Sequence, residues 1–219
     1  PAVRTNMMAV PLREFSGNEI YASRFGITIW NLGASCCTEV FEVPESTFRN
    51  THLWHIGKWG VYGYGSNRVT FDGTVQRGDP QMLARGEGGT AFFFGDYIAR
   101  NTRITNADIR NVGTGVEVPT KAGDVRDIYG KSPGTFVVEH SYFQTVTGIY
   151  LELPWAVTGG GGALPPRATT LRDIRYQAPS VSTGDRRPQA IYAAVRRDRP
   201  NPNFLVADRI IVEQFNGNS

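Results

Sequence analysis

The segment PTKAGDVRDIYGKSPG, from Pro119 to Gly134, brings together charged side chains of both signs. Lys, Arg, His and Tyr act as acids or bases once their pKa is tuned, and a bound cation can neutralise a carboxylate. The strand-like run that follows, FVVEHSYFQ, adds a histidine and a tyrosine. The candidate catalytic residues are Lys121, Arg126, His140 and Tyr142. Asp124 and Asp127 are candidates for substrate binding, because a loop of mixed sign can hold a cation and a carboxylate together.

The orientation of His140 and Tyr142 is predicted from strand periodicity. Successive side chains of a strand alternate between its faces, so Val138, His140 and Tyr142 share one face and Glu139 lies on the other. Tyr142 also occupies the apolar position of the repeat described below, which favours inward orientation for both side chains. A hydrogen-bonded structural histidine is therefore the alternative to a catalytic one, and a solvated surface is the alternative for the charged loop.

Aromatic side chains are the second chemical signal. Sugar rings stack on exposed aromatic rings, and Trp and Tyr also carry a polar group. The candidates for substrate binding by such contacts are Trp54, Trp59, Tyr62, Tyr64 and Trp155. Tyr62 and Tyr64 share one face of a strand, whereas Trp155 precedes the glycine-rich run AVTGGGGALPP. Core packing is the alternative for these rings.

An arginine-rich stretch, GDRRPQAIYAAVRRDRPNPN, suits an anionic polymer such as a uronate or a sulfated sugar. Asp185 and Asp198 dilute its charge, and no nucleic-acid-binding motif accompanies it. The net charge of +3 is also small. We therefore do not expect nucleic acid as a partner, and a solvated, partly paired face is the alternative for this stretch.

Metal binding has little support in the sequence. Cys36 and Cys37 are adjacent, which strains a disulfide between them. Two small buried thiols or one half-exposed pair are the favoured interpretation, with a disulfide between neighbours or metal binding as the alternatives. His52 and His55 have a spacing that binds metal on a helix, but THLWHIGKWG is typical of a strand and a turn. No cofactor is expected, with Ca²⁺ as the alternative, and the metal site is left open.

The elements that must position these residues are short strands. The chain has 219 residues, of which 40% are hydrophobic, and 25 glycines and 13 prolines favour a turn-rich β protein in one domain, 1–219. GDPQMLARGEGG is the nearest approach to a helix, with one or two turns, and no apolar run approaches the ~20 residues of a membrane span. Pro1 and the ending EQFNGNS predict a piece of a longer polypeptide, whose other domains would be partners.

A unit of strand, corner and strand recurs along the chain. The segments EIYASRFGITI, DIRNVGTGVEV and SYFQTVTGIYL each place an apolar residue six positions before a glycine. The apolar residues are Ile20, Ile109 and Tyr142, the glycines are Gly26, Gly115 and Gly148, and a fourth copy carries Trp54 and Gly60. We expect the glycines to form corners with positive φ and asparagines to share hydrogen bonds between coils. The pattern predicts an all-β solenoid of parallel strands with little or no helix.

The stretch NTRITNADIRNVGTGVEV, from Asn101 to Val118, resembles the right-handed parallel β-helix superfamily, which includes pectate, alginate and chondroitin lyases and polygalacturonases. The resemblance covers most of the range from Ser16 to Phe215 and implies a single-stranded right-handed parallel β-helix. It also implies a ligand groove outside one sheet, walled by loops. The polygalacturonase motifs N-T-D, D-D, G-H-G and R-I-K are missing, and RRDRPNPN is only distantly similar to the pectate lyase R-x-P-x-x-R. No catalytic residue is therefore carried over.

The function implied by this resemblance is that of a secreted or cell-surface module that binds an acidic polysaccharide. Cleavage by a polysaccharide lyase or glycoside hydrolase mechanism is an extension that the sequence leaves open. The alternative is a non-catalytic structural or adhesion segment of a larger cell-surface protein. We expect the ligand beside the loop from Pro119 to Gly134, against His140 and within reach of Arg126 and Lys121.

Overall fold

The computed structural model describes residues 6–34, 41–94, 99–118, 134–153, 167–183, 186–195 and 203–213. For residues 152–153, 167–168, 195 and 203–213 it describes the backbone alone. Several residues singled out in the sequence lie outside these ranges: Lys121, Asp124, Arg126, Asp127, Trp155, Cys36 and Cys37. The expected ligand site beside the charged loop therefore stays a prediction.

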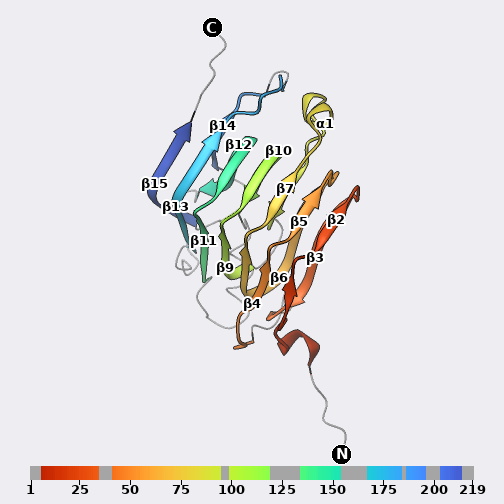
Figure 1. Ribbon diagram of the computed structural model, residues 1–219. Helices are drawn as coiled ribbons and strands as arrows, with labels where there is room; N and C mark the ends of the chain where they lie inside the picture. Colours follow the sequence, from red (N-terminus) through yellow and green to blue (C-terminus); the bar gives the residue numbers. More distant parts are fainter. Residues whose placement is uncertain are drawn as a thin grey trace, which may run out of the picture.

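The described chain is a parallel β-solenoid, which confirms the predicted fold class. All pairings between its named strands are parallel, and long strands bend through the corners so that one continuous sheet winds around the core. Figure 1 shows successive passes of the chain lying side by side, from the red end to the blue end.

Three rows of paired strands surround the core, and we call them the first, second and third sheets. The first sheet consists of β1 (Phe15–Ser16), β4 (Ser46–Arg49), the end of β6 (Trp59–Asp72), β9 (Ala99–Thr105), β11 (Thr135–Glu139) and the starts of β13 (Arg167–Gln177) and β15 (Asn203–Glu213). The second sheet consists of β2 (Glu19–Tyr21), β5 (His52–Trp54), β7 (Val75–Arg77), the starts of β10 (Asp108–Glu117) and β12 (Tyr142–Leu153), and the ends of β13 and β15. The third sheet consists of β3 (Phe25–Leu32), the start of β6, β8 (Thr90–Phe93), the ends of β10 and β12, and β14 (Gln189–Val195).

Asparagines form the corners of the stretch NTRITNADIRN. Asn101, Asn106 and Asn111 have φ values of 47°, 54° and 59°, in the left-handed region that Asn tolerates better than most residues. The side-chain amide of Asn101 donates from Nδ2 to Oδ1 of Asn67 on the preceding coil at 3.0 Å. The predicted hydrogen bond between asparagines of successive coils is therefore confirmed at this corner.

The glycines of the repeat are not corners, so that part of the prediction is wrong. Gly26, Gly115 and Gly148 do not have φ in the left-handed region. A Cβ atom at Gly26 would instead lie 2.3 Å from the carbonyl oxygen of Gly60, and one at Gly115 would lie 2.5 Å from that of Gly148. These positions need glycine because the backbone of the neighbouring coil occupies the space of a side chain.

A bulge explains a second error in the predicted repeat. Ile109 pairs with Phe143, not with Tyr142, because Asn111 is an extra residue in β10 where the register with β12 shifts. Phe143 is fully buried and Tyr142 is only half-buried. The predicted inward orientation of Tyr142 is therefore wrong, and this side chain belongs to the outer surface.

The core is built from inward rows that repeat from coil to coil. The rings of Phe48 and Phe71 stack with centroids 5.0 Å apart, on adjacent strands of the first sheet. In the second sheet, Gln76 lies between Leu53 and Ile109 in the inward row. Gln76 is 1% exposed, and its two amide atoms have no hydrogen-bond partner. This row therefore contains a polar group that burial leaves unsatisfied.

Helix is confined to two short pieces in the residues that the structure describes. The helix α1 (Pro80–Ala84) falls in the segment where the sequence predicts one or two turns, and the side chain of Asp79 caps it by accepting from the Gln81 backbone N–H at 2.7 Å. A single 3₁₀ turn, η1 (Met7–Ala9), precedes β1. No described helix has the length and apolar character needed to cross a membrane.

Candidate functional site

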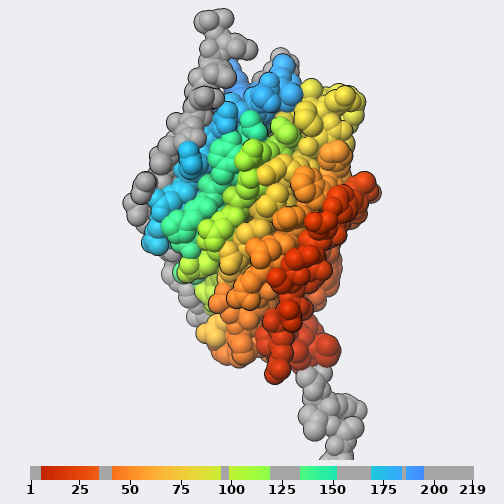
Figure 2. All heavy atoms as spheres, in the orientation of Figure 1, coloured from red at the N-terminus to blue at the C-terminus, as the bar shows by residue number. Residues whose placement is uncertain are grey.

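The second sheet presents two outward rows of side chains, one on each side of its inward row. Each strand contributes one residue to each row, because side chains alternate along a strand. The first row is Glu19, His52, Val75, Asp108, Tyr142 and Arg175; the second row is Tyr21, Trp54, Arg77, Arg110, Gln144 and Gln177. The strands of this sheet face the viewer in Figure 1, and Figure 2 shows their side chains as adjoining bands across the same face.

His140 lies at the corner that leads into β12. Its φ of 49° interrupts the strand alternation, so Val138 is fully buried whereas the His140 side chain is 49% exposed. The prediction that these two residues share a face is therefore wrong. Nδ1 of His140 lies 3.2 Å from Oδ2 of Asp173, which occupies the same corner on the next coil and also has a φ of 49°.

A groove of about 550 Å³ opens between this corner and the outward rows. Its side walls include Asp108, Arg110, His140, Tyr142, Asp173 and Arg175. Two of the four predicted catalytic residues, His140 and Tyr142, therefore meet in one place. Sequence reasoning missed the four charged residues of the groove, although Asp108 and Arg110 begin a repeat copy that was aligned with the segment containing Tyr142.

Asp108 holds two arginines on the outer face. Nε and Nη2 of Arg110 donate to its two carboxylate oxygens at 2.8 and 3.0 Å, and Nη2 of Arg77 donates at 2.5 Å. Partial burial raises the pKa of Asp108, but the hydrogen bonds from Arg110 and Arg77 outweigh it and lower the pKa below its ordinary value. The bond to Asp108 also raises the pKa of Arg110. The groove itself contains two guanidinium groups, of Arg110 and Arg175, and two carboxylates, of Asp108 and Asp173.

Tyr142 lies beside one of these arginines. The guanidinium carbon of Arg110 is 5.0 Å from the centroid of the Tyr142 ring, and the Tyr142 hydroxyl donates to the side chain of Gln177. An arginine has five N–H donors, so its two bonds to Asp108 do not exhaust the donors of Arg110. The groove can therefore bind a carboxylate or sulfate through its arginines. The His140 imidazole, oriented by Asp173, is a candidate for proton transfer on the ground of this geometry.

Glu139, which precedes His140, is a buried carboxylate that pairs with arginines of the first sheet. It is 5% exposed and lies between two arginines of adjacent coils, bonded to Arg103 and 3.6 Å from Nη1 of Arg172. Two cations are therefore held together on the first sheet by one buried carboxylate. This arrangement places Glu139 among the groups that stabilise the coil stack.

The predicted aromatic residues divide between two sheets. Trp59, Tyr62 and Tyr64 point outward from the third sheet, where the Trp59 ring stacks on Tyr62 at 4.5 Å and on Phe93 at 4.6 Å. Nζ of Lys58 lies 4.1 Å from the centroid of the same Trp59 ring. These rings already cover one another, so this stack serves coil-to-coil packing better than it serves a sugar ring.

Trp54 lies on the second sheet, in the same outward row as Arg77 and Arg110. Its ring lies nearly parallel to that of Tyr21, at an interplanar angle of 13° and a centroid distance of 6.2 Å. Tyr21, which sequence reasoning missed, is 60% exposed and donates from its hydroxyl to Glu19. That hydrogen bond raises the pKa of the Tyr21 phenol.

Metal ligands do not cluster in the part of the chain that the structure describes, where no three His, Cys, Asp or Glu side chains are placed to hold an ion. His52 lies on β5 and pairs with Glu19 at 3.5 Å, and His55 occupies a corner with a φ of 53°. The prediction of a strand and turn for this segment is confirmed.

Comparison of the chain with protein-family models, with curated proteins and with solved structures finds no match. The parallel β-solenoid is therefore assigned from the strand pairing itself, and no family is assigned.

Proposed function

We propose that this chain binds an acidic polysaccharide along the outer face of its second sheet, anchored at the groove. The observation that carries the proposal is the groove, in which Arg110 and Arg175 lie on either side of Tyr142 with the paired side chains of His140 and Asp173 beside them. Polymers of this kind lie outside cells, so the proposal includes secretion or display at the cell surface.

The arginines of the face favour an anionic ligand. Arg77, Arg110 and Arg175 share the face with the carboxylates of Glu19, Asp108 and Asp173, so the contacts depend on the placement of the guanidinium groups and not on a net charge. Asp108 holds two of the three arginines in place before any ligand arrives. An arginine fixed in this way loses little conformational freedom on binding, so more of the contact energy is retained. Arginine also matches the planar geometry of a carboxylate through paired N–H donors.

The solenoid suits a linear polymer because its outward residues recur at a constant spacing. Adjacent strands lie about 4.8 Å apart, which is close to the advance of one pyranose unit in an extended chain. A polymer that runs across the strands meets a new pair of outward side chains at each coil. Isolated small anions would use only the groove.

Binding of the intact polymers is the direct test. Isothermal titration calorimetry with pectate, alginate, chondroitin and hyaluronan should detect at least one ligand. Arg110→Ala or Arg175→Ala should weaken its affinity about tenfold, since one charge-assisted contact contributes about 1.5–3 kcal/mol. The loss should shrink at high salt, which screens the interaction.

Arg49→Ala is the matched control. Arg49 is an exposed arginine on the first sheet, so its replacement removes the same charge from outside the groove. Equal losses for the groove variants and Arg49→Ala would reduce the effect to net charge and refute a site at the groove. Absence of binding to all four polymers would refute the proposal and favour a structural or adhesion segment.

Cleavage is a second candidate activity, favoured by the orientation of His140. In β-elimination a base removes the C5 proton of a uronate, the C4–O bond breaks as a C4–C5 double bond forms, and the departing oxygen takes a proton. His140, held by Asp173 at 3.2 Å, is the candidate base, and the Tyr142 hydroxyl is the candidate proton donor. An arginine beside the uronate carboxylate would stabilise the carbanion-like transition state.

The variant His140→Asn separates cleavage from folding. Asparagine already occupies the equivalent corner at Asn106, so the substitution keeps a residue that tolerates positive φ. If His140 is the base, the ultraviolet absorbance of the unsaturated product should vanish while polymer binding persists. A bound polymer that yields neither unsaturated product nor new reducing ends would refute cleavage, and reducing ends alone would indicate hydrolysis.

A further inference from the structure

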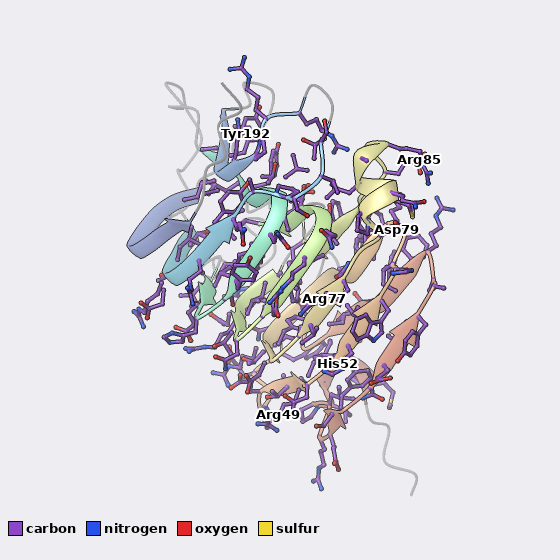
Figure 3. All side chains as sticks on the ribbon, turned by 45° about the horizontal axis from the view of Figure 1, so that its top comes forward. Arg49, His52, Arg77, Asp79, Arg85 and Tyr192 are labelled. Atoms are coloured by element: carbon purple, nitrogen blue, oxygen red, sulfur yellow. The ribbon has the colours of Figure 1, made fainter. Side chains whose placement is uncertain are left out.

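The outer face of the second sheet extends beyond the groove to a second cluster of polar and aromatic side chains. Glu19, Tyr21, His52 and Trp54 lie on β2 and β5, at the other end of the rows that contain Asp108 and Arg110. Figure 3 shows the labelled His52 and Arg77 on adjacent strands of this face. The cluster and the groove are therefore joined without a break by Arg77 on β7.

The cluster is held together by its own contacts. Tyr21 donates to Glu19, Nδ1 of His52 lies 3.5 Å from Oε1 of Glu19, and the His52 ring meets the edge of Trp54 at 88°. The rings of Tyr21 and Trp54 are nearly parallel. These contacts restrict the side chains before a ligand binds, which lowers the ordering cost of binding.

The cluster is also accessible. Tyr21 is 60% exposed, and the side chains of His52 and Glu19 are 39% and 49% exposed. Trp54 is half-buried. An exposed, fixed aromatic ring such as that of Tyr21 accepts the C–H face of a sugar ring, and nearby carboxylate and imidazole groups can bond its hydroxyls. This chemistry differs from that of the groove, where two guanidinium groups lie among two carboxylates and a histidine and the aromatic ring of Tyr142 is only half-buried.

We propose that Glu19, Tyr21, His52 and Trp54 form a distal sugar subsite, and that the ligand is an extended anionic polysaccharide spanning at least five sugar units. This inference rests on the proposed function. The row from Tyr21 through Trp54, Arg77, Arg110 and Gln144 to Gln177 crosses six strands, a distance of about 24 Å at the ordinary strand spacing. The acidic groups of the polymer meet the arginines, and a sugar ring near one end stacks on the exposed ring of Tyr21, which its own stack on Trp54 holds in place.

Affinity should therefore depend on chain length. The probes are size-defined oligouronates of two and of six units, prepared from pectate, alginate, chondroitin and hyaluronan. The six-unit oligomer of the recognised polymer should bind at least tenfold more tightly than the two-unit oligomer. Tyr21→Ala or Trp54→Ala should weaken six-unit binding by about tenfold and leave two-unit binding unchanged, whereas Arg110→Ala should weaken both.

Two further variants isolate the stacking contact. Tyr21→Phe keeps the ring and should keep most of the six-unit affinity. Retained affinity in Tyr21→Phe, beside the loss in Tyr21→Ala, would assign that loss to the missing ring. Trp30→Ala removes a tryptophan that is also 60% exposed but lies on the third sheet, and it should leave binding of both oligomers unchanged.

The outcomes separate the two proposals. If the two oligomers bind equally, or if Tyr21→Ala and Trp54→Ala leave six-unit binding intact, the distal subsite is refuted and the proposed function stands. If neither oligomer of any polymer binds, the proposed function is refuted and the subsite with it. Loss of six-unit binding in Trp30→Ala to the same degree as in Trp54→Ala would also overturn the assignment of the subsite to the second sheet.

Discussion

Replacement of Gly115 by alanine tests why glycine recurs in the repeat. A Cβ atom at this position would lie 2.5 Å from the carbonyl oxygen of Gly148 and 2.5 Å from Cδ1 of Phe143. Ordinary van der Waals contact begins at 3.4 Å, so relief requires a shift of about 0.9 Å. The oxygen belongs to the backbone of the next coil and Phe143 is fully buried, so neither atom can move aside without disturbing the stack.

The expected cost lies at the upper end of the range for overpacking. Extra methyl groups in a packed core cost about 1–3 kcal/mol. Alanine also lowers the conformational entropy of the unfolded chain, which stabilises the folded protein by about 0.4–1 kcal/mol. We therefore expect Gly115→Ala to lower the free energy of unfolding by about 2 kcal/mol.

Gly17→Ala is the matched control, because it separates backbone strain from lack of space. Gly17 has a φ of +66°, and a Cβ atom there would meet nothing within 4 Å. Its replacement by alanine introduces only the left-handed backbone strain, about 1–2 kcal/mol. The lower entropy of the unfolded chain offsets part of this cost, as it does for Gly115→Ala. Gly17→Ala should therefore lose about half as much stability as Gly115→Ala.

Urea unfolding followed by tryptophan fluorescence measures both variants, from the transition midpoint and slope. The explanation by close approach is refuted if Gly115→Ala is no more destabilised than Gly17→Ala.

Three other substitutions and one control test the packing and charge arrangement. Gln76→Leu should raise the free energy of unfolding by about 1–2 kcal/mol, because it removes a buried amide that has no hydrogen-bond partner; an unchanged or lower urea midpoint would contradict this. Asp108→Asn should lower stability at pH 7 by about 1–2 kcal/mol, since it removes the carboxylate shared by Arg77 and Arg110. Because the folded pKa of Asp108 is lowered, its contribution is fully present above the ordinary value of 3.8 and is lost as the pH falls through the folded pKa. The melting temperatures of the two proteins should therefore converge below pH 3.8, and a gap that widens in acid would refute the assignment. Glu139→Gln should lower the free energy of unfolding by about 1–2 kcal/mol, because Arg103 and Arg172 would face each other without a carboxylate between them. Thermal melts measure this loss. Glu87→Gln, which breaks an exposed pair with Arg85, should change stability by less than about 0.5 kcal/mol.

The fold could be predicted from the sequence because the asparagines at the corners and the short apolar runs between them both favour stacked coils. Asparagines recur at every fifth position from Asn101 to Asn111, and each adopts the corner conformation that its side chain tolerates. Short apolar runs between such corners cannot fold alone, so stacking of coils is the arrangement that buries them. The absence of a sustained helical period then excludes a helical fold.

Side-chain orientation was harder to predict because it depends on single residues that shift the register. Because β10 contains the extra residue Asn111, Tyr142 pairs with Asp108 in the outward row and not with Ile109 in the inward row. The corner at His140 likewise breaks an alternation that a straight strand would have kept. One extra residue reverses the face of all the side chains that follow it, so an alignment of repeats by their glycines alone cannot settle which residues line a site.

The candidate site was only partly predictable because its residues come from separate coils. His140, Asp108 and Arg175 come from three coils and meet because the second sheet contributes short, equivalent segments to each coil. Insertions such as α1 lie between sheets and leave this register intact. Outward residues of the second sheet can therefore change without disturbing the inward row of Leu53, Ile109 and Phe143. A solenoid of this kind can adjust its recognition of a polymer one coil at a time, and the charge and aromatic character of each outward pair is the property to test first.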